Sequence, residues 1–224
     1  MIIIQHLKVT QSPYNYSMIP LFVDCSRRRI VIFGGGDVAE RKARFFSKES
    51  AVTVVSRSFT QKITELAVKR IEGDVAHLTD DAVIRMVSGV FLVVGALSDP
   101  NQNDRIGRLC REKGILFNNA DGEPGDVIIP SVTKGKNYTI AVSTGGSSPA
   151  ISRFIREDLE AKYPALDAMI ALQDEVRERL RAKVSSQPER NAILREILHD
   201  TGVWTLLAED PAQARVKIQE KYNL

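Results

Sequence analysis

A short apolar run leads into three consecutive glycines and continues into a helix-like stretch: Arg28-Arg29-Ile30-Val31-Ile32-Phe33-Gly34-Gly35-Gly36-Asp37-Val38-Ala39-Glu40-Arg41-Lys42-Ala43-Arg44. In this strand–turn–helix context, a G-x-G-x-x-A pattern indicates dinucleotide binding. Gly34 would make the tight turn, and Gly36 would let the backbone approach a pyrophosphate. Ala39 would permit close packing of the helix on the strand, and the N–H groups that open the helix would face the phosphates. The alternative is a tight structural turn at a sheet edge.

Strand-like and helix-like segments alternate on both sides of the glycine turn. The runs 51–55 and 90–94 are nearly continuous in apolar residues, as buried parallel strands are. Further strands are expected at 30–33, 71–77 and 115–117, and helices at 37–48, 60–70, 79–87 and 100–113. Alternating units of this length predict an α/β fold with a Rossmann-like, doubly wound parallel sheet, which we assign to residues 1–120 as an NAD-binding domain.

The pattern changes after Asn118. Two strand-like runs, 127–130 and 138–142, flank the turn residues Lys134-Gly135-Lys136-Asn137, which predicts an antiparallel hairpin. Because an isolated hairpin is marginal in water, we expect the region 121–148 to pair with another chain or to pack on helices. Apolar stripes in the remaining residues predict a C-terminal α-helical domain over 149–224.

Composition excludes several classes of protein. The 224 residues carry a net charge of only +3 and their basic residues are scattered, which argues against nucleic-acid binding. No apolar stretch reaches the roughly 20 residues that a membrane span needs, and the N-terminus lacks the features of a signal peptide. Cys25 and Cys110 form no CxxC pair and no Cys/His cluster of metal spacing. We therefore expect a cytoplasmic protein with free thiols, no metal site and no membrane partner.

The residues that follow the predicted strands are candidates for cofactor binding, because ligands of open α/β sheets lie beyond the carboxyl ends of the strands. The second strand is followed by Ser56, Arg57 and Ser58, without the acid that usually holds the ribose hydroxyls. A serine can still bond a ribose hydroxyl and Arg57 could accept a 2′-phosphate, so NAD and NADP both stay open. The small residues around Ala96 and Leu97 after the fourth strand would let the cofactor cross.

Two further features could carry chemistry. Asp121 follows the fifth strand, where the nicotinamide half would lie. It could take a proton while a hydride leaves to the cofactor, or it could be an Asx-turn residue before Gly122. The hydroxyl- and glycine-rich loop from Ser143 to Pro149 precedes a predicted helix, and it could bind an anion or simply cap that helix.

Four motifs, in this order, resemble the precorrin-2 dehydrogenase family, the module also found at the N-terminus of multifunctional siroheme synthases: Gly34-Gly35-Gly36-Asp37-Val38-Ala39-Glu40-Arg41-Lys42, Asn118-Asn119-Ala120-Asp121, Ile129-Pro130-Ser131 and Ser143-Thr144-Gly145-Gly146-Ser147-Ser148-Pro149-Ala150. The similarity runs from about Pro20 into the C-terminal helices. The resemblance implies oxidation of precorrin-2, a small-molecule tetrapyrrole, to sirohydrochlorin with NAD as hydride acceptor. It also implies a homodimer in which the hairpin region and helices form much of the interface.

The resemblance further implies residue roles. The family's proposed catalytic aspartate falls on Asp121, and its tetrapyrrole contacts fall on Ser143 and Thr144. Together with the reading of the strand ends, the expected cofactor contacts are Gly34, Gly35, Gly36, Asp37, Val38, Ala39, Ser56, Arg57, Ser58, Phe59, Ala96 and Leu97.

Relatives that this resemblance brings in carry two further activities, methyl transfer and metal insertion. The methyltransferase domain of the fused enzymes is absent from the sequence, so we expect no synthesis of precorrin-2 by this chain. Insertion of iron or cobalt stays open. An alternative of a different class is a regulatory module that senses NAD(H) through the glycine turn and transmits its state through the helical tail.

Overall fold

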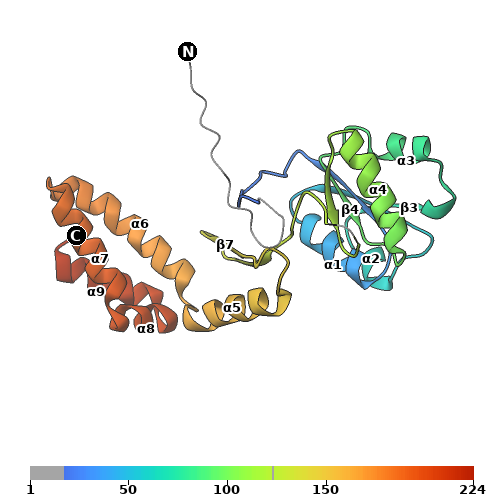
Figure 1. Cartoon of the computed structure of the whole chain (residues 1–224). Coiled ribbons are helices and arrows are strands. Elements are labelled where there is room, and N and C mark those ends of the chain that lie inside the picture. Colours follow the sequence, from blue (N-terminus) through green and yellow to red (C-terminus); the bar gives the residue numbers. More distant parts are fainter. Residues whose placement is uncertain (1–17, 123) are drawn as a thin grey trace, which may run out of the picture. The chain divides into compact units, whose positions relative to one another are not determined.

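The computed structural model describes residues 18–122 and 124–224 (Figure 1). The chain divides into two compact units, one ending at Ile129 and the other running from Pro130 to Leu224. The predicted division into residues 1–120, 121–148 and 149–224 stays a prediction.

The first unit is built on a five-stranded sheet with the order β3-β2-β1-β4-β5, in which all neighbours run parallel. Its strands are β1 (Arg29–Phe33), β2 (Ala51–Ser56), β3 (Lys69–Glu72), β4 (Leu92–Gly95) and β5 (Leu116–Asn119). The connecting helices are α1 (Asp37–Phe46), α2 (Gln61–Thr64), the 3-10 helix η1 (Val75–His77), α3 (Asp80–Val87) and α4 (Pro100–Glu112). The predicted Rossmann-like sheet is confirmed, and its order reverses between β1 and β4, which is where such sheets bind ligands.

The apolar strands separate two hydrophobic cores. Ile30 and Ile32 of β1 pack on the side of α1 and α2, whereas Val31 and Phe33 pack on the side of α3 and α4. A strand covered by helices on both faces must be apolar at nearly every position. This explains why the runs in β1, β2 and β4 lack the alternation of a half-exposed strand.

The helix expected over 60–70 is wrong in its extent, because α2 covers only Gln61–Thr64. The hydroxyl of Thr60 accepts the N–H of Ile63 and caps the start of this helix. The guanidinium of Arg70 donates to the carbonyl oxygens of Ile63 and Thr64, at 3.5 and 2.8 Å. These bonds satisfy the end of the short helix, and β3 begins at Lys69, earlier than expected.

The second unit starts with a hairpin, β6 (Ser131–Lys134) paired antiparallel with β7 (Thr139–Val142). The predicted hairpin is confirmed, but the strand assigned to 127–130 is wrong. Val127 and Ile129 pack against a core of the first unit, and the N–H of Val127 donates to the carbonyl of Phe117 on β5 at 3.1 Å. Pro130 has no N–H to donate to a strand partner, and it separates this segment from the hairpin.

Helices complete the second unit: α5 (Pro149–Lys162), α6 (Leu166–Lys183), α7 (Gln187–His199), α8 (Thr201–Glu209) and α9 (Pro211–Tyr222). The stripe predicted on α6, including Met169, Leu172 and Val176, is buried in a core shared with α7, α8 and α9. The carboxylate of Asp167 accepts the N–H groups of Lys136 and Asn137, at 2.7 and 2.8 Å, and thereby ties the hairpin turn to α6. These hydrogen bonds lower the pKa of Asp167.

Candidate active site

A cavity of about 910 Å³ lies at the carboxyl ends of the parallel strands. Nearly all residues expected to contact the cofactor line it: Gly34, Gly35, Gly36, Asp37, Val38, Ser56, Arg57, Ser58, Phe59, Ala96 and Leu97. Asp121 lines the same cavity. Ala39 does not, because it is fully buried in the core between α1 and the sheet, where it can serve the site only through packing.

The three glycines of the turn are constrained in different ways. Gly34 has φ +126°, and a Cβ added there would overlap the carbonyl of Ala96. A Cβ added to Gly35 would overlap the carbonyl of Ser58. At Gly36, by contrast, φ is −87° and nothing lies within 4 Å of an added Cβ. The protein's own packing therefore requires the first two glycines, while Gly36 leaves open space at the N-terminus of α1. Helix N-termini with such open space are typical sites of phosphate binding.

An acidic side chain does reach the expected ribose end of the cavity, but from a different strand. Asp74 follows β3 and lines the cavity together with Arg57. Its Oδ2 lies 3.7 Å from Nη1 of Arg57 and 3.2 Å from Nδ1 of His77, while its Oδ1 accepts the N–H of Ala76 at 3.0 Å. Asp74 is not among the residues predicted from the sequence, because the acid of this motif is usually found after the second strand. The signal was present as Gly73-Asp74, directly after the carboxyl end of β3.

Asp121 is exposed, and its backbone is held on both sides by asparagines. Its N–H donates to Oδ1 of Asn119 at 3.3 Å, and its carbonyl accepts a hydrogen bond from Nδ2 of Asn103 at 3.2 Å. The next residue, Gly122, has φ +121°, a backbone conformation that favours glycine. The chain therefore turns sharply after Asp121 and leaves its carboxylate at the cavity. Its role as a base stays a prediction.

Ser143 and Thr144 belong to the second unit. The hydroxyl of Thr144 accepts the N–H of Ser148 at 2.9 Å and donates to the carbonyl of Ser148 at 3.0 Å. Oγ of Ser143 accepts the N–H of Gly145 at 3.1 Å, and Oγ of Ser148 caps α5. These hydroxyls hold the loop and the helix start. Their contact with a substrate stays a prediction.

Neither thiol offers a reactive group in the cavity described above. Cys110 is fully buried on α4, and burial is the main cause that raises its pKa to about 12. Cys25 lies before β1 and does not line the cavity. Across residues 18–122 and 124–224, no group of three or more His, Cys, Asp or Glu side chains is placed to hold a metal ion. Within the same described ranges, no helix has the length and apolarity to cross a membrane.

Comparisons with known proteins agree with the two parts of this chain. Residues 21–131 match the model of a family described as "Putative NAD(P)-binding", and residues 139–162 match one described as "Sirohaem biosynthesis protein central". A precorrin-2 dehydrogenase of Methanosarcina barkeri is 39% identical over 203 residues, which are 88% of this chain and 90% of that protein. Siroheme synthase 1 of Pectobacterium atrosepticum is 31% identical over 179 residues, which are 79% of this chain and 36% of that protein.

A solved structure described as SirC, precorrin-2 dehydrogenase, matches with a TM-score of 0.65 and 23% identity. The match covers 91% of this chain and 100% of the other. At this identity the structural likeness speaks for the fold, and it covers the parallel sheet, the hairpin and the helices. The identity and coverage shared with the Methanosarcina barkeri protein show that the chain belongs to the precorrin-2 dehydrogenase family.

Proposed function

We propose that this chain oxidises precorrin-2 to sirohydrochlorin with NAD⁺ as the hydride acceptor. One observation carries the proposal: in a member of this family, a single cavity at the carboxyl edge of the sheet is lined by both the glycine turn and Asp121. A dehydrogenase needs a dinucleotide that accepts the hydride from one atom of the substrate and a base that accepts the proton from another, so both must reach the same part of the substrate. A nucleotide-sensing module would need no carboxylate at that place.

The reaction removes one hydride and one proton from the macrocycle and leaves a new double bond that extends its conjugation. When bound, NAD⁺ supplies the hydride acceptor. The open space at Gly36 and the N–H groups that start α1 would hold the pyrophosphate. Asp121 would take the proton, because its carboxylate is exposed in the cavity while its backbone is fixed.

The direct test mixes the purified protein with precorrin-2 and NAD⁺ and follows formation of NADH and sirohydrochlorin. Both products should form in equal amounts. If neither NAD⁺ nor NADP⁺ is reduced above the background without protein, the proposed function is wrong. Adding iron or cobalt after the oxidation measures whether the chain also inserts a metal into sirohydrochlorin.

The preference for NAD⁺ over NADP⁺ is expected to depend on Asp74. Its carboxylate compensates the charge of Arg57 and would repel a 2′-phosphate. Asp74→Asn should therefore raise the affinity for NADP⁺ relative to NAD⁺ by up to about fivefold, since exposed ion pairs are worth roughly 0.2–1 kcal/mol. Titration calorimetry with both dinucleotides measures the ratio. The control is Glu72→Gln, an acid-to-amide change on β3 outside the cavity; equal ratios in both variants would contradict the assignment.

We also propose that the functional protein is a homodimer that covers one face of α5. Three apolar side chains of this helix are exposed, namely Ile151 (49%), Phe154 (66%) and Ile155 (39%). The helix packs on the hairpin, where Nε of Arg156 lies 3.1 Å from Oγ of Ser131. A hairpin supported on one side and an apolar helix face beside it are typical of a protein interface.

Phe154→Glu is expected to convert the dimer to monomer, because a carboxylate would be buried in the interface without a partner. Sedimentation velocity at several concentrations measures the state. The matched control is Val216→Glu on α9, another exposed apolar position (53%), which should stay dimeric. A wild-type protein that remains monomeric at every concentration would contradict the proposed dimer.

A further inference from the structure

We propose that Asn103 is a positioning residue that fixes the cofactor loop and the proton acceptor relative to each other. This inference rests on the proposed function, since it gives Asp121 the role of base. Asn103 lies in α4, which starts just after the loop of Ala96 and Leu97. The sequence alone does not distinguish it, because it is one of several polar residues on an amphipathic helix.

The amide of Asn103 is fully buried, and both of its ends are engaged. Oδ1 accepts the N–H of Leu97 at 3.0 Å. Nδ2 donates to the carbonyl of Leu97 at 3.0 Å and to the carbonyl of Asp121 at 3.2 Å. The reversed amide would set its oxygen against two carbonyl oxygens, so the network permits one orientation. A single side chain thereby joins the residues that follow β4 to those that follow β5.

The surrounding packing leaves this amide little room to move. A Cβ added to Gly95 would lie 3.1 Å from Oδ1 of Asn103 and 3.3 Å from its Cβ, and it would also press on the ring of Phe117. Gly95 is itself buried at the end of β4. The absence of a side chain there is what lets the amide approach the strand ends. A satisfied, closely packed amide of this kind favours one local geometry.

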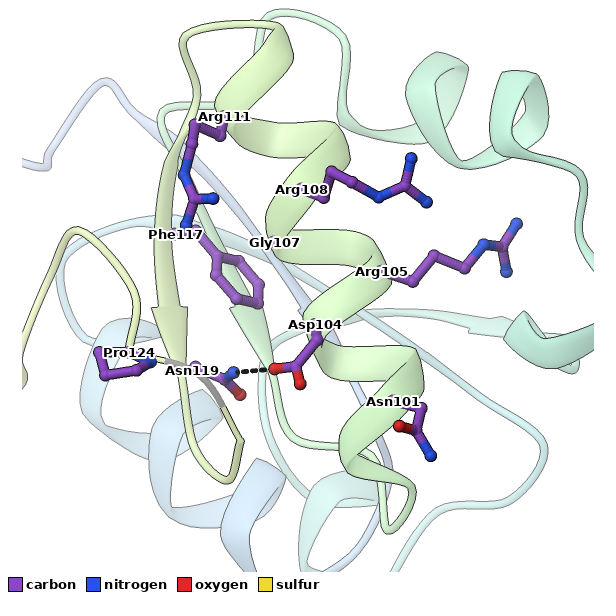
Figure 2. A pocket seen from close by; sticks show the side chains of 9 residues that line it. All are labelled: Asn101, Asp104, Arg105, Gly107, Arg108, Arg111, Phe117, Asn119 and Pro124. Carbon is purple, nitrogen blue, oxygen red and sulfur yellow. Dashed lines mark hydrogen bonds between the residues drawn. The ribbon is translucent and has the colours of Figure 1, made fainter.

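Asp104, the residue after Asn103 on α4, holds the backbone N–H of Asp121 indirectly, through Asn119. Figure 2 shows the hydrogen bond that Nδ2 of Asn119, on β5, donates to Oδ1 of Asp104, on α4; its length is 2.9 Å. Oδ1 of Asn119 in turn accepts the N–H of Asp121. The carbonyl of Asp121 is thus held by α4 directly, and its N–H is held through Asn119. The same view shows Asn101 pointing away from this pair, which makes it a useful control.

A proton acceptor works only at the correct distance from the reacting atom. A displacement of about 1 Å can cost roughly 100-fold in rate. Loss of the Asn103 amide would release the carbonyl of Asp121 and both backbone groups of Leu97 at once. The structure therefore assigns to Asn103 an effect on kcat through Asp121 and a smaller effect on cofactor affinity through Leu97.

The test uses the full chain with Asn103→Ala, Asn103→Asp and the control Asn101→Ala. Asn103→Ala should lower kcat by roughly 10- to 100-fold, with a smaller change in KM for precorrin-2. Asn101→Ala, on the exposed side of the same helix, should behave like wild type. In an Asp121→Asn background, Asn103→Ala should lower kcat little further, because its effect passes through the removed carboxylate. An equal additional loss in that background would overturn the proposal.

Asn103→Asp serves where the alanine variant does not fold, since it keeps the shape and the acceptor but loses both donated bonds. Burial would raise the pKa of the introduced carboxyl, and its protonated form can donate one bond again. The ratio of wild-type to variant kcat should therefore rise with pH, and a ratio independent of pH would contradict the inference.

Hydrogen exchange provides a readout that does not depend on the reaction. Amides in the segments 96–98 and 119–122 should exchange faster in Asn103→Ala than in Asn101→Ala, with little change in β1 and β2. Unchanged exchange in both segments would overturn the proposed positioning role of Asn103. If Asn103→Ala speeds exchange in these segments but the wild-type protein oxidises no precorrin-2, the proposed function is wrong. The structural role of Asn103 in fixing the two segments would still hold.

Discussion

Asp121→Asn is expected to lower kcat by roughly 10²- to 10⁴-fold, which is the usual contribution of a positioned general base. Asparagine has nearly the same shape as aspartate but cannot take a proton at this step. The backbone bonds that fix residue 121 come from Asn103 and Asn119 and do not use the carboxylate. The substitution should therefore preserve the local fold, and the affinity for NAD⁺ should change little.

Single-turnover oxidation of precorrin-2 and calorimetric titration with NAD⁺ measure the two quantities separately. The control is Asp81→Asn, an acid on the first turn of α3 that does not line the cavity. Turnover that survives Asp121→Asn would mean that Asp121 only shapes the turn before Gly122, which was the alternative reading of the sequence. A proportional loss of NAD⁺ affinity would instead assign the carboxylate to cofactor binding.

The parts of the site that could be predicted from sequence are those set by local backbone chemistry. The glycine turn can be recognised in the sequence because only glycine fits at Gly34 and Gly35, where any Cβ would overlap a backbone carbonyl. Asp99 caps α4 and Asp210 caps α9, and each is followed by proline, a pair of residues that typically starts a helix. Continuous apolar strands likewise predict a sheet covered on both faces.

The parts that were missed depend on which strands become neighbours. Asp74 reaches the expected ribose end of the cavity because β3 lies next to β2, so that the residues after both strands share one edge. The proposed role of Asn103 depends on the packing of α4 beside β5. This packing brings its buried amide to the carbonyl of Asp121, 18 residues further along the chain. Val127 and Ile129 have the composition of a strand, yet they cover the core beside β5. Such partners follow from tertiary packing, which a local pattern does not contain.

Gly36→Val is expected to remove most NAD⁺ binding while leaving the fold intact. Nothing lies within 4 Å of a Cβ added to Gly36, and its backbone is in an ordinary conformation, so an added Cβ would overlap no atom of the protein. Gly36 is also the N-cap of α1, where valine is less favourable than glycine, so only a small loss of stability is expected. A bound pyrophosphate would require glycine at this position, because a larger side chain would fill the space in front of α1. Hydrogen bonds to charged groups are worth about 1.5–3 kcal/mol each, so losing one or two of them should weaken binding by roughly tenfold to more than a thousandfold.

The adjacent glycine provides the matched comparison. Gly35→Ala adds a smaller group, but its Cβ would overlap the backbone carbonyl of Ser58. That variant should lose much thermal stability as well as cofactor affinity, whereas Gly36→Val should lose only the small amount that a less favourable N-cap costs. Thermal unfolding with and without NAD⁺ tests both: the cofactor should raise the melting temperature of wild type but not that of Gly36→Val. If Gly36→Val still binds NAD⁺ normally, the cofactor does not approach the start of α1, and the turn would be a structural feature of the sheet edge.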